Sequence, residues 1–187
     1  MGNSAVSTND ARSEFVLPAL GTKPVAIQLL LLFAAAFLLP AGAHALGLPV
    51  RSLLPMHWPV IFAGLCYGWR SGAIIGLAAP VLSFLISGMP LPHILPSMTV
   101  ELAAYGFLAG FGREYLRLNW LAATAMALIG GRIVFLAIVF STRAVPESFG
   151  NYIVAAMLPG IWAALGQLVV LSLLAWWFVG RQSGSDT

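Results

Sequence analysis

Charged side chains are scarce in this sequence. Asp, Glu, Lys and Arg make up 8% of the 187 residues, whereas soluble domains carry about a quarter. Hydrophobic residues make up 60%, and the mean hydropathy is +0.93. So few charges cannot cover a surface that faces water, and no cluster of Lys and Arg with interleaved aromatics is present to bind a nucleic acid. The composition therefore predicts an integral membrane protein whose main solvent is lipid.

Cysteine and the common catalytic motifs are also missing. The single cysteine, Cys66, excludes an intramolecular disulfide and a cysteine-based metal site. The sequence has no Gly-x-Ser-x-Gly elbow, no Gly-rich phosphate loop ending in Lys-Ser/Thr and no His-Glu-x-x-His pair. We therefore expect no enzyme activity, no cofactor and no bound metal. If the chain takes part in active transport, partner subunits must hydrolyse the ATP.

Apolar stretches of helical length alternate with short polar segments along the chain. About 20 apolar residues cross a bilayer as a helix. We predict an all-α integral membrane protein with six transmembrane helices in a domain at 23–181, flanked by a disordered cytosolic tail at 1–22 and a second cytosolic tail at 182–187. The predicted spans are Pro24–Gly42, His57–Tyr67, Ser71–Ser87, Pro96–Gly112, Trp120–Phe140 and Tyr152–Val179.

Positive charges between the spans are distributed unevenly, which predicts the orientation. Two of them, Arg51 and Arg143, fall on the side opposite the termini. Because Lys and Arg are retained in the cytoplasm, both termini are expected inside, in a multi-pass protein of the bacterial plasma membrane. The outer loops at 44–56, 88–95 and 141–150 are longer than the inner ones, which favours capture of something from outside. The charges on the inner side are Arg12, Lys23, Arg70, Arg113, Arg117 and Arg181.

Two ionisable residues inside the predicted spans stand out. A charge inside a membrane is costly, so such residues are functional candidates by default. At 1.5 Å per residue, Glu101 is about 8 Å below the outer end of span four, and Arg132 is about 12 Å below that of span five. Tyr105 lies one turn from Glu101 on the same face. An outer-half pocket with Arg132 at its floor would suit a carboxylate or phosphate, because guanidinium binds planar anions with two hydrogen bonds. Alternatively, Glu101 and Arg132 only neutralise each other.

Span six adds further candidates for binding. Asn151 lies at its outer end, Trp162 below it and Gln167 near mid-depth. Trp162 offers a stacking face, although it could instead pack in the core or face lipid. Gln167 offers a hydrogen-bond donor and an acceptor, although an interhelical hydrogen bond would explain it too.

Two histidines provide an alternative to transport. His57 and His93 flank outer segments, and together with Glu101 they could hold a metal or serve an intramembrane enzyme. Their spacing matches no established metal-binding motif, so interfacial or pocket-lining roles are the simpler interpretation. A structural membrane subunit without a ligand is the third alternative.

Small residues recur four positions apart in three places. Such spacing lets helix backbones approach closely in a membrane. It predicts tight packing within the bundle or, alternatively, a flat face that docks on another membrane subunit. The pairs are Gly64 and Gly68, Gly72 and Gly76, and Gly106 and Gly110.

A series of short motifs lies between residues 55 and 113. The motifs are Pro55-Met56-His57-Trp58-Pro59-Val60, Ala63-Gly64-Leu65, Gly68-Trp69-Arg70-Ser71-Gly72-Ala73, Ser87-Gly88-Met89-Pro90, Glu101-Leu102-Ala103-Ala104-Tyr105-Gly106 and Ala109-Gly110. Taken in this order, they resemble the substrate-binding S components of energy-coupling factor (ECF) vitamin transporters. Outside this region the likeness rests on span count and topology.

The resemblance implies a six-helix S component that captures a vitamin or related micronutrient in its outer half. The ligand would lie under the first two outer loops, which adds Trp58 and Met89 to the candidate site. The implied partners are a transmembrane coupling subunit and two ATPases, with toppling of the S component to deliver the ligand inward; a solitary transporter is the alternative. Arg132 favours an acidic ligand such as pantothenate, lipoate or biotin, and the pattern around Met56-His57 is most similar to members assigned to pantothenate or cobalamin.

Overall fold

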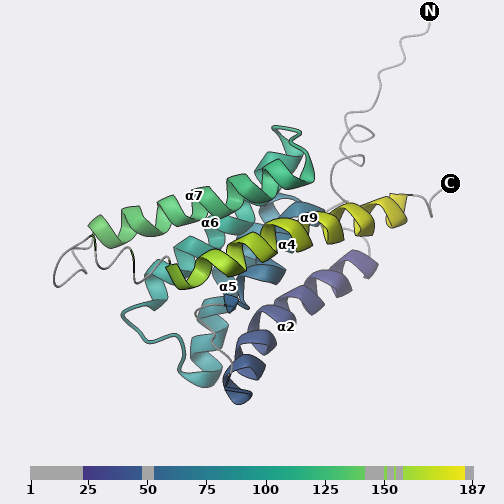
Figure 1. The fold of residues 1–187 in the computed structure, drawn as a ribbon. Coiled ribbons are helices and arrows are strands. Elements are labelled where there is room, and N and C mark those ends of the chain that lie inside the picture. Colours follow the sequence, from purple (N-terminus) through teal and green to yellow (C-terminus); the bar gives the residue numbers. More distant parts are fainter. Residues whose placement is uncertain (1–22, 48–52, 142–149, 151–153, 155–157, 184–187) are drawn as a thin grey trace, which may run out of the picture.

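The computed structural model describes residues 23–47, 53–141, 150, 154 and 158–183 (Figure 1). Within these residues every regular element is helical, which confirms the all-α prediction for this part of the chain. The elements are α2 (Lys23–Ala45), α4 (His57–Tyr67), α5 (Trp69–Ser87), α6 (Leu95–Glu114), α7 (Trp120–Ser141), the 3₁₀ helix η1 (Leu158–Gly160) and α9 (Ile161–Ser183).

The predicted spans agree with these helices at most ends. The range predicted for α4 matches residue for residue, and those for α5, α6 and α7 differ by at most two residues at either end. The sixth span differs more, because α9 begins only at Ile161, after the 3₁₀ turn of η1. Pro159 and Gly160 both disfavour a continuous helix at that point. Most of the predicted beginning of this span, at 152–153 and 155–157, lies outside the described residues.

Among the described residues, four helices are long and apolar enough to cross a membrane: α2, α5, α7 and the η1–α9 unit. α4 has only 11 residues, which corresponds to a rise of about 17 Å. α6 has 20 residues but includes Glu101, Arg113 and Glu114. Each predicted span thus corresponds to a helix, whereas the number of complete membrane crossings stays a prediction.

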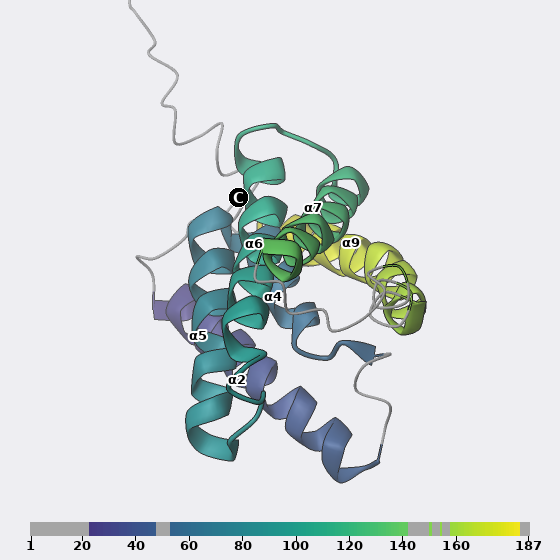
Figure 2. The same cartoon turned by 90° about the vertical axis from the view of Figure 1, so that its left-hand side faces the viewer.

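The short helix α4 forms the centre of the bundle. It contacts α2, α5, α6, α7 and α9 (Figures 1 and 2). All of its residues except Trp58 and Phe62 are buried, as expected for a helix that is apolar on every side. Its side chains divide the core in two. Ile61 and Leu65 pack with residues of α7 and α9, whereas Val60 packs with residues of α2 and α5.

Glycines bring α4, α5 and α6 into backbone contact. A Cβ at Gly72 of α5 would overlap the carbonyl oxygen of Gly106 on α6, and so would a Cβ at Gly64 of α4. Gly110 lies equally close to the backbone of Trp69. Because lipid is as apolar as Leu, membrane helices associate through such close packing rather than through the hydrophobic effect. The glycine repeats therefore serve packing inside the bundle, which is the first of their two interpretations.

Cationic side chains gather at one end of the bundle. The start of α2, the connection from α6 to α7 and the end of α9 all lie there (Figure 1). Cζ of Arg113 is 3.6 Å from the ring centroid of Trp120, and Cζ of Arg181 is 4.4 Å from that of Trp177. Stacking of this kind anchors cations beside the aromatic residues of a membrane interface. Arg113 and Arg181 thus belong to segments at one end of the bundle, whereas Arg51 and Arg143 lie outside the described residues, and the orientation stays a prediction.

Candidate functional site

An ion pair between α6 and α7 lies at the heart of the candidate site. Nη1 of Arg132 donates a hydrogen bond of 3.0 Å to Oε1 of Glu101. The side chain of Glu101 is only 6% exposed, and that of Arg132 is 20% exposed. A buried charge inside a membrane is costly unless a partner neutralises it. The contact agrees with the similar depths predicted for the two residues.

His57 and Tyr105 adjoin this ion pair. His57 is the first residue of α4, and its Nε2 lies 3.9 Å from the same oxygen of Glu101 that Arg132 binds. The rings of His57 and Tyr105 meet edge to face, with their centroids 4.9 Å apart. Both side chains are buried, and neither ring nitrogen of His57 has a hydrogen-bond partner in the described part of the chain. His57 therefore brings to the site a buried donor and a buried acceptor that the described residues leave unused.

Two backbone turns meet near Arg132. A Cβ at Gly160 would lie 3.0 Å from Nη2 of Arg132 and 3.2 Å from a methyl carbon of Leu54. Leu54 has a φ of 47°, a left-handed conformation that side-chain-bearing residues rarely adopt, so the chain turns sharply before α4. Trp58 secures this turn, since its Nε1 donates a 3.1 Å hydrogen bond to the carbonyl of Leu53. The turn before α4 and the turn before α9 thus meet beside the guanidinium.

Sequence reasoning missed Leu54 and Gly160. The Pro159-Gly160 pair was a usable signal, because such a pair breaks a helix and marks a turn. Leu54 gave no signal, since its part in the site depends on a backbone conformation that a leucine does not favour.

Trp58 of α4 approaches α9, and Gln167 is buried on the same stretch of that helix. Gln167 is fully buried, and neither atom of its amide group has a hydrogen-bond partner among the residues described. The interhelical hydrogen bond that was its alternative explanation is thus not found there. Trp58 reaches the same stretch of α9, because its Cη2 would be 4.0 Å from a Cβ at Gly166.

The remaining candidates are exposed or lie outside the description. Met89 is 46% exposed, and His93 is exposed in the connection between α5 and α6. Trp162 is 78% exposed on α9, which suits the lipid-facing alternative. Asn151 lies outside the described residues. The structure therefore brings together the candidates on α4, α6 and α7.

Few side chains that could bind a metal lie together in the part of the chain that the structure describes. No group of three His, Cys, Asp or Glu side chains there is placed to hold a metal ion. His57 and Glu101 are close together, but His93, the third member of the proposed metal or enzyme site, is on the surface.

Comparison with known proteins identifies the family. A family model described as "ECF transporter, substrate-specific component" matches residues 27–181, which is most of the chain and includes the whole ion-pair site. No curated protein and no solved structure matches the chain. A substrate-binding role agrees with a polar cluster buried in an otherwise apolar bundle. The chain belongs to the family of ECF transporter substrate-specific components and is a substrate-binding subunit of a membrane transporter.

Proposed function

We propose that this subunit binds a small micronutrient with a carboxylate group, and that Arg132 binds the carboxylate. The ion pair with Glu101 carries this proposal, because Arg132 is its more accessible member, at 20% exposure against 6%. Glu101 accepts a hydrogen bond from one guanidinium nitrogen, Nη1, whereas a guanidinium has five N–H donors. Arg132 therefore keeps donors for a second carboxylate. Pantothenate, lipoate and biotin are acidic vitamins of this kind.

The unpartnered polar atoms of His57 and Gln167 support a polar ligand. A buried donor or acceptor without a partner destabilises a protein by about 1 to 3 kcal/mol. Both side chains are buried, and both lack hydrogen bonds to the described residues. A solute that reaches them would satisfy these groups, and the stabilisation would appear as binding affinity.

His57 also gives Glu101 a second partner. Nε2 of His57 is 3.9 Å from Oε1 of Glu101, which is about 1 Å beyond a normal hydrogen bond. In the tautomer that carries a proton on Nε2, a small movement of either side chain makes this bond. Glu101 then stays partnered while Arg132 turns to the carboxylate of the ligand. The exchange leaves the Glu101 carboxylate with a hydrogen-bond donor at every stage.

We further propose uptake from outside, across the plasma membrane of a bacterium. The uneven distribution of Arg and Lys favours the orientation in which His57 and Glu101 are reached from the exterior. Family membership implies association with an ECF coupling subunit and ATPase subunits, and we assign ATP hydrolysis to two such ATPases.

Native mass spectrometry of the purified protein tests this proposal, because it identifies a small molecule that the protein retains. If the molecule is a carboxylic acid, we expect its methyl ester to bind at least about tenfold more weakly in a calorimetric titration. Arg132→Gln should remove the difference between acid and ester, whereas Arg181→Gln should preserve it. Equal binding of acid and ester to the unaltered protein would exclude Arg132 as the carboxylate-binding residue. Retention of a solute without a carboxylate, such as cobalamin, would contradict the acidic class and leave the transporter role in place.

A further inference from the structure

An acidic solute that binds at the ion pair brings one negative charge too many. Without it, Arg132 and Glu101 neutralise each other across 3.0 Å. A second carboxylate at Arg132 adds a charge that a single guanidinium cannot balance. A hydrogen bond from neutral His57 gives Glu101 a donor but no counter-charge. Because an uncompensated charge is costly inside a membrane, the complex needs a second positive charge.

His57 is placed to supply this positive charge. Its Nε2 lies 3.9 Å from Oε1 of Glu101, its side chain is only 5% exposed, and neither ring nitrogen has a hydrogen-bond partner among the described residues. One nitrogen can therefore accept a proton while the other donates to Glu101. The edge-to-face contact with Tyr105, whose own ring packs against Gly131, holds the imidazole in this position.

The other charged residues of the helices lie toward the opposite end of the bundle. His57 is the first residue of α4, whereas Arg70 comes just after the end of that helix. Arg113 and Glu114 are about 18 Å or more farther along α6 than Glu101. The first turn of α2 and the last turn of α9 share the cation-rich end (Figure 1). They carry Lys23 and Arg181.

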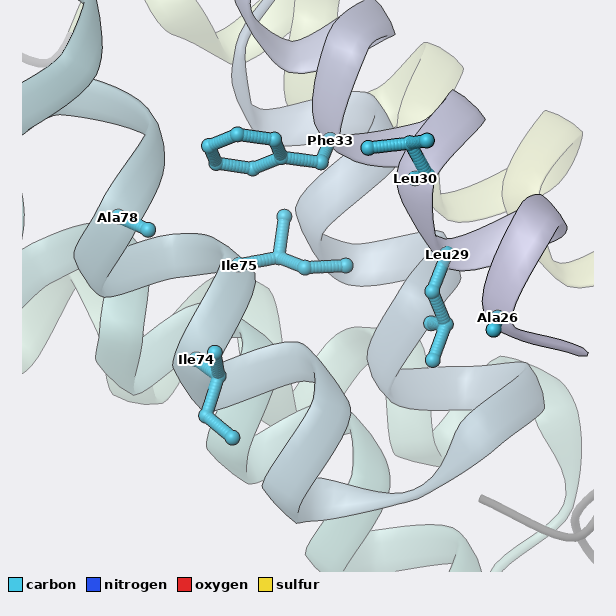
Figure 3. A pocket seen from close by; sticks show the side chains of 7 residues that line it. All are labelled: Ala26, Leu29, Leu30, Phe33, Ile74, Ile75 and Ala78. Carbon is cyan, nitrogen blue, oxygen red and sulfur yellow. The ribbon is translucent and has the colours of Figure 1, made fainter. Parts of the chain in front are cut away.

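Near His57, α2 and α5 pack on α4 with apolar side chains. Met56 and Val60 belong to a core cluster that residues of these two helices complete. The groove between α2 and α5 is likewise lined by apolar side chains alone (Figure 3). The side chain of His44, near the end of α2, lies outside the described part of the chain. Among the described side chains, the ionisable ones that adjoin His57 and its partner are Glu101, Tyr105 and Arg132.

We propose that the acidic solute binds together with one proton, which His57 takes up. The inference rests on the proposed function, because it needs a carboxylate at Arg132. Arg132 then pairs with the solute and cationic His57 pairs with Glu101, so the site is neutral both before and after binding. An unperturbed histidine titrates at about pH 6.5 and a glutamate at about pH 4.3. At neutral pH the proton therefore goes to His57 rather than to Glu101.

The linked proton makes binding depend on pH. The complex holds one proton more than the free protein and the free anion, so a rise in pH opposes binding. Above about pH 6.5, where free His57 is neutral, the affinity should fall about tenfold per pH unit. Without the proton the affinity would stay constant over this range, because the guanidinium of Arg132 keeps its charge.

Nitrogen-15 NMR of the histidine rings tests the proposal without a ligand. The chain has three histidines, and His57→Phe identifies the signal of His57. At about pH 7.5, above the usual titration of histidine, we expect a neutral ring in the ligand-free protein. In Arg132→Gln the charge of Glu101 has no guanidinium beside it, and His57 should become cationic. Arg181→Gln is the matched control and should leave the ring neutral.

Calorimetry counts the proton in the complex. Pantothenate, lipoate and biotin are each titrated into the full-length protein at about pH 7.5, in phosphate and in Tris buffer, which differ in ionisation enthalpy. The difference between the two binding enthalpies should correspond to about one proton taken up. His57→Phe should lower this number to near zero, whereas His93→Phe, at an exposed position, should preserve it. The bound acid should also turn the NMR signal of His57 into that of the cation.

Three results would overturn the proposal and leave the carboxylate site in place. They are a neutral His57 in folded Arg132→Gln, an acid that binds without proton uptake, and proton uptake that persists in His57→Phe. In the last case Glu101 or the solute itself holds the proton. Failure of all three acids to bind would count against the proposed function instead, and the signal of His57 in Arg132→Gln would still decide whether this residue answers the charge of Glu101.

Discussion

Gly131 of α7 packs directly against the aromatic ring of Tyr105 on α6. A Cβ at position 131 would lie 2.7 Å from both Cδ1 and Cε1 of that ring. The next residue, Arg132, reaches across the same contact to Glu101. The missing side chain at Gly131 therefore lets α7 approach α6 closely enough for the ion pair to form.

Gly131→Ala tests this relationship. Tyr105 is only 1% exposed, so its ring has no free space into which to move, and the two helices must separate. We expect a loss of about 1 to 3 kcal/mol in stability, the usual effect of overpacking, together with weaker ligand binding. Thermal unfolding in detergent measures the change. Gly180→Ala is the control, because a Cβ at Gly180 meets nothing within 4 Å. An unchanged melting temperature in Gly131→Ala would show that the ring adapts and that the contact does not position α7.

A double variant separates the structural from the binding role of the ion pair. Arg132→Gln alone leaves the carboxylate of Glu101 at 6% exposure without its partner, so we expect a loss of about 3 to 5 kcal/mol. Adding Glu101→Gln removes the uncompensated charge and should restore most of the stability. Affinity for the acidic ligand should stay low in both variants. If the double variant regained binding along with stability, the ion pair would be only structural.

Replacing His57 distinguishes a ligand-exchange role from packing. His57→Phe keeps the ring contact with Tyr105 but removes both nitrogens, which make no hydrogen bond to the described residues. We therefore expect little change in the melting temperature of the ligand-free protein and a loss of at least about tenfold in ligand affinity. His93→Phe, at an exposed position, should change neither. Normal affinity in His57→Phe would mean that Glu101 needs no second partner.

Gln167→Leu should raise stability while lowering affinity. The amide of Gln167 is fully buried and unpartnered among the residues described, so an apolar side chain of similar size should stabilise the ligand-free protein by about 1 kcal/mol or more. If the amide binds the solute, the same change should weaken binding. Melting temperatures with and without ligand measure both effects. A lower melting temperature with unchanged affinity would instead indicate a hydrogen bond that holds the helices together.

The helices and the ion pair could be predicted because each rests on a local rule. Hydropathy over helical lengths located the six α-helices, and α4 even residue for residue, since its ends are marked by Pro55 before it and Gly68 after it. The cost of charge inside lipid singled out Glu101 and Arg132. Neither rule requires knowledge of how the helices pack.

The inward faces of the helices were harder to predict. Trp162 and Gln167 are five residues apart, about 140° around a helix, so only one of them can point straight into the bundle. α9 is apolar on all sides, so its sequence does not indicate which one. The structure buries Gln167 and exposes Trp162. The contacts of Gly131 and Gly160 were equally hidden, because a glycine shows its importance only through the neighbour that occupies the space of its missing side chain.

The shortness of α4 has an electrical consequence. Gly68 joins α4 directly to α5, which is long enough to cross the membrane, so in the proposed topology this junction lies at one membrane surface and His57 about 15 Å beneath it. That depth is about half of a hydrocarbon core roughly 30 Å thick. An anion that binds beside His57 from outside has therefore crossed about half of the membrane voltage, which opposes it by about 1 kcal/mol per 100 mV. An energised cell would hold an acidic solute that binds without a proton less tightly at this depth than a detergent micelle does.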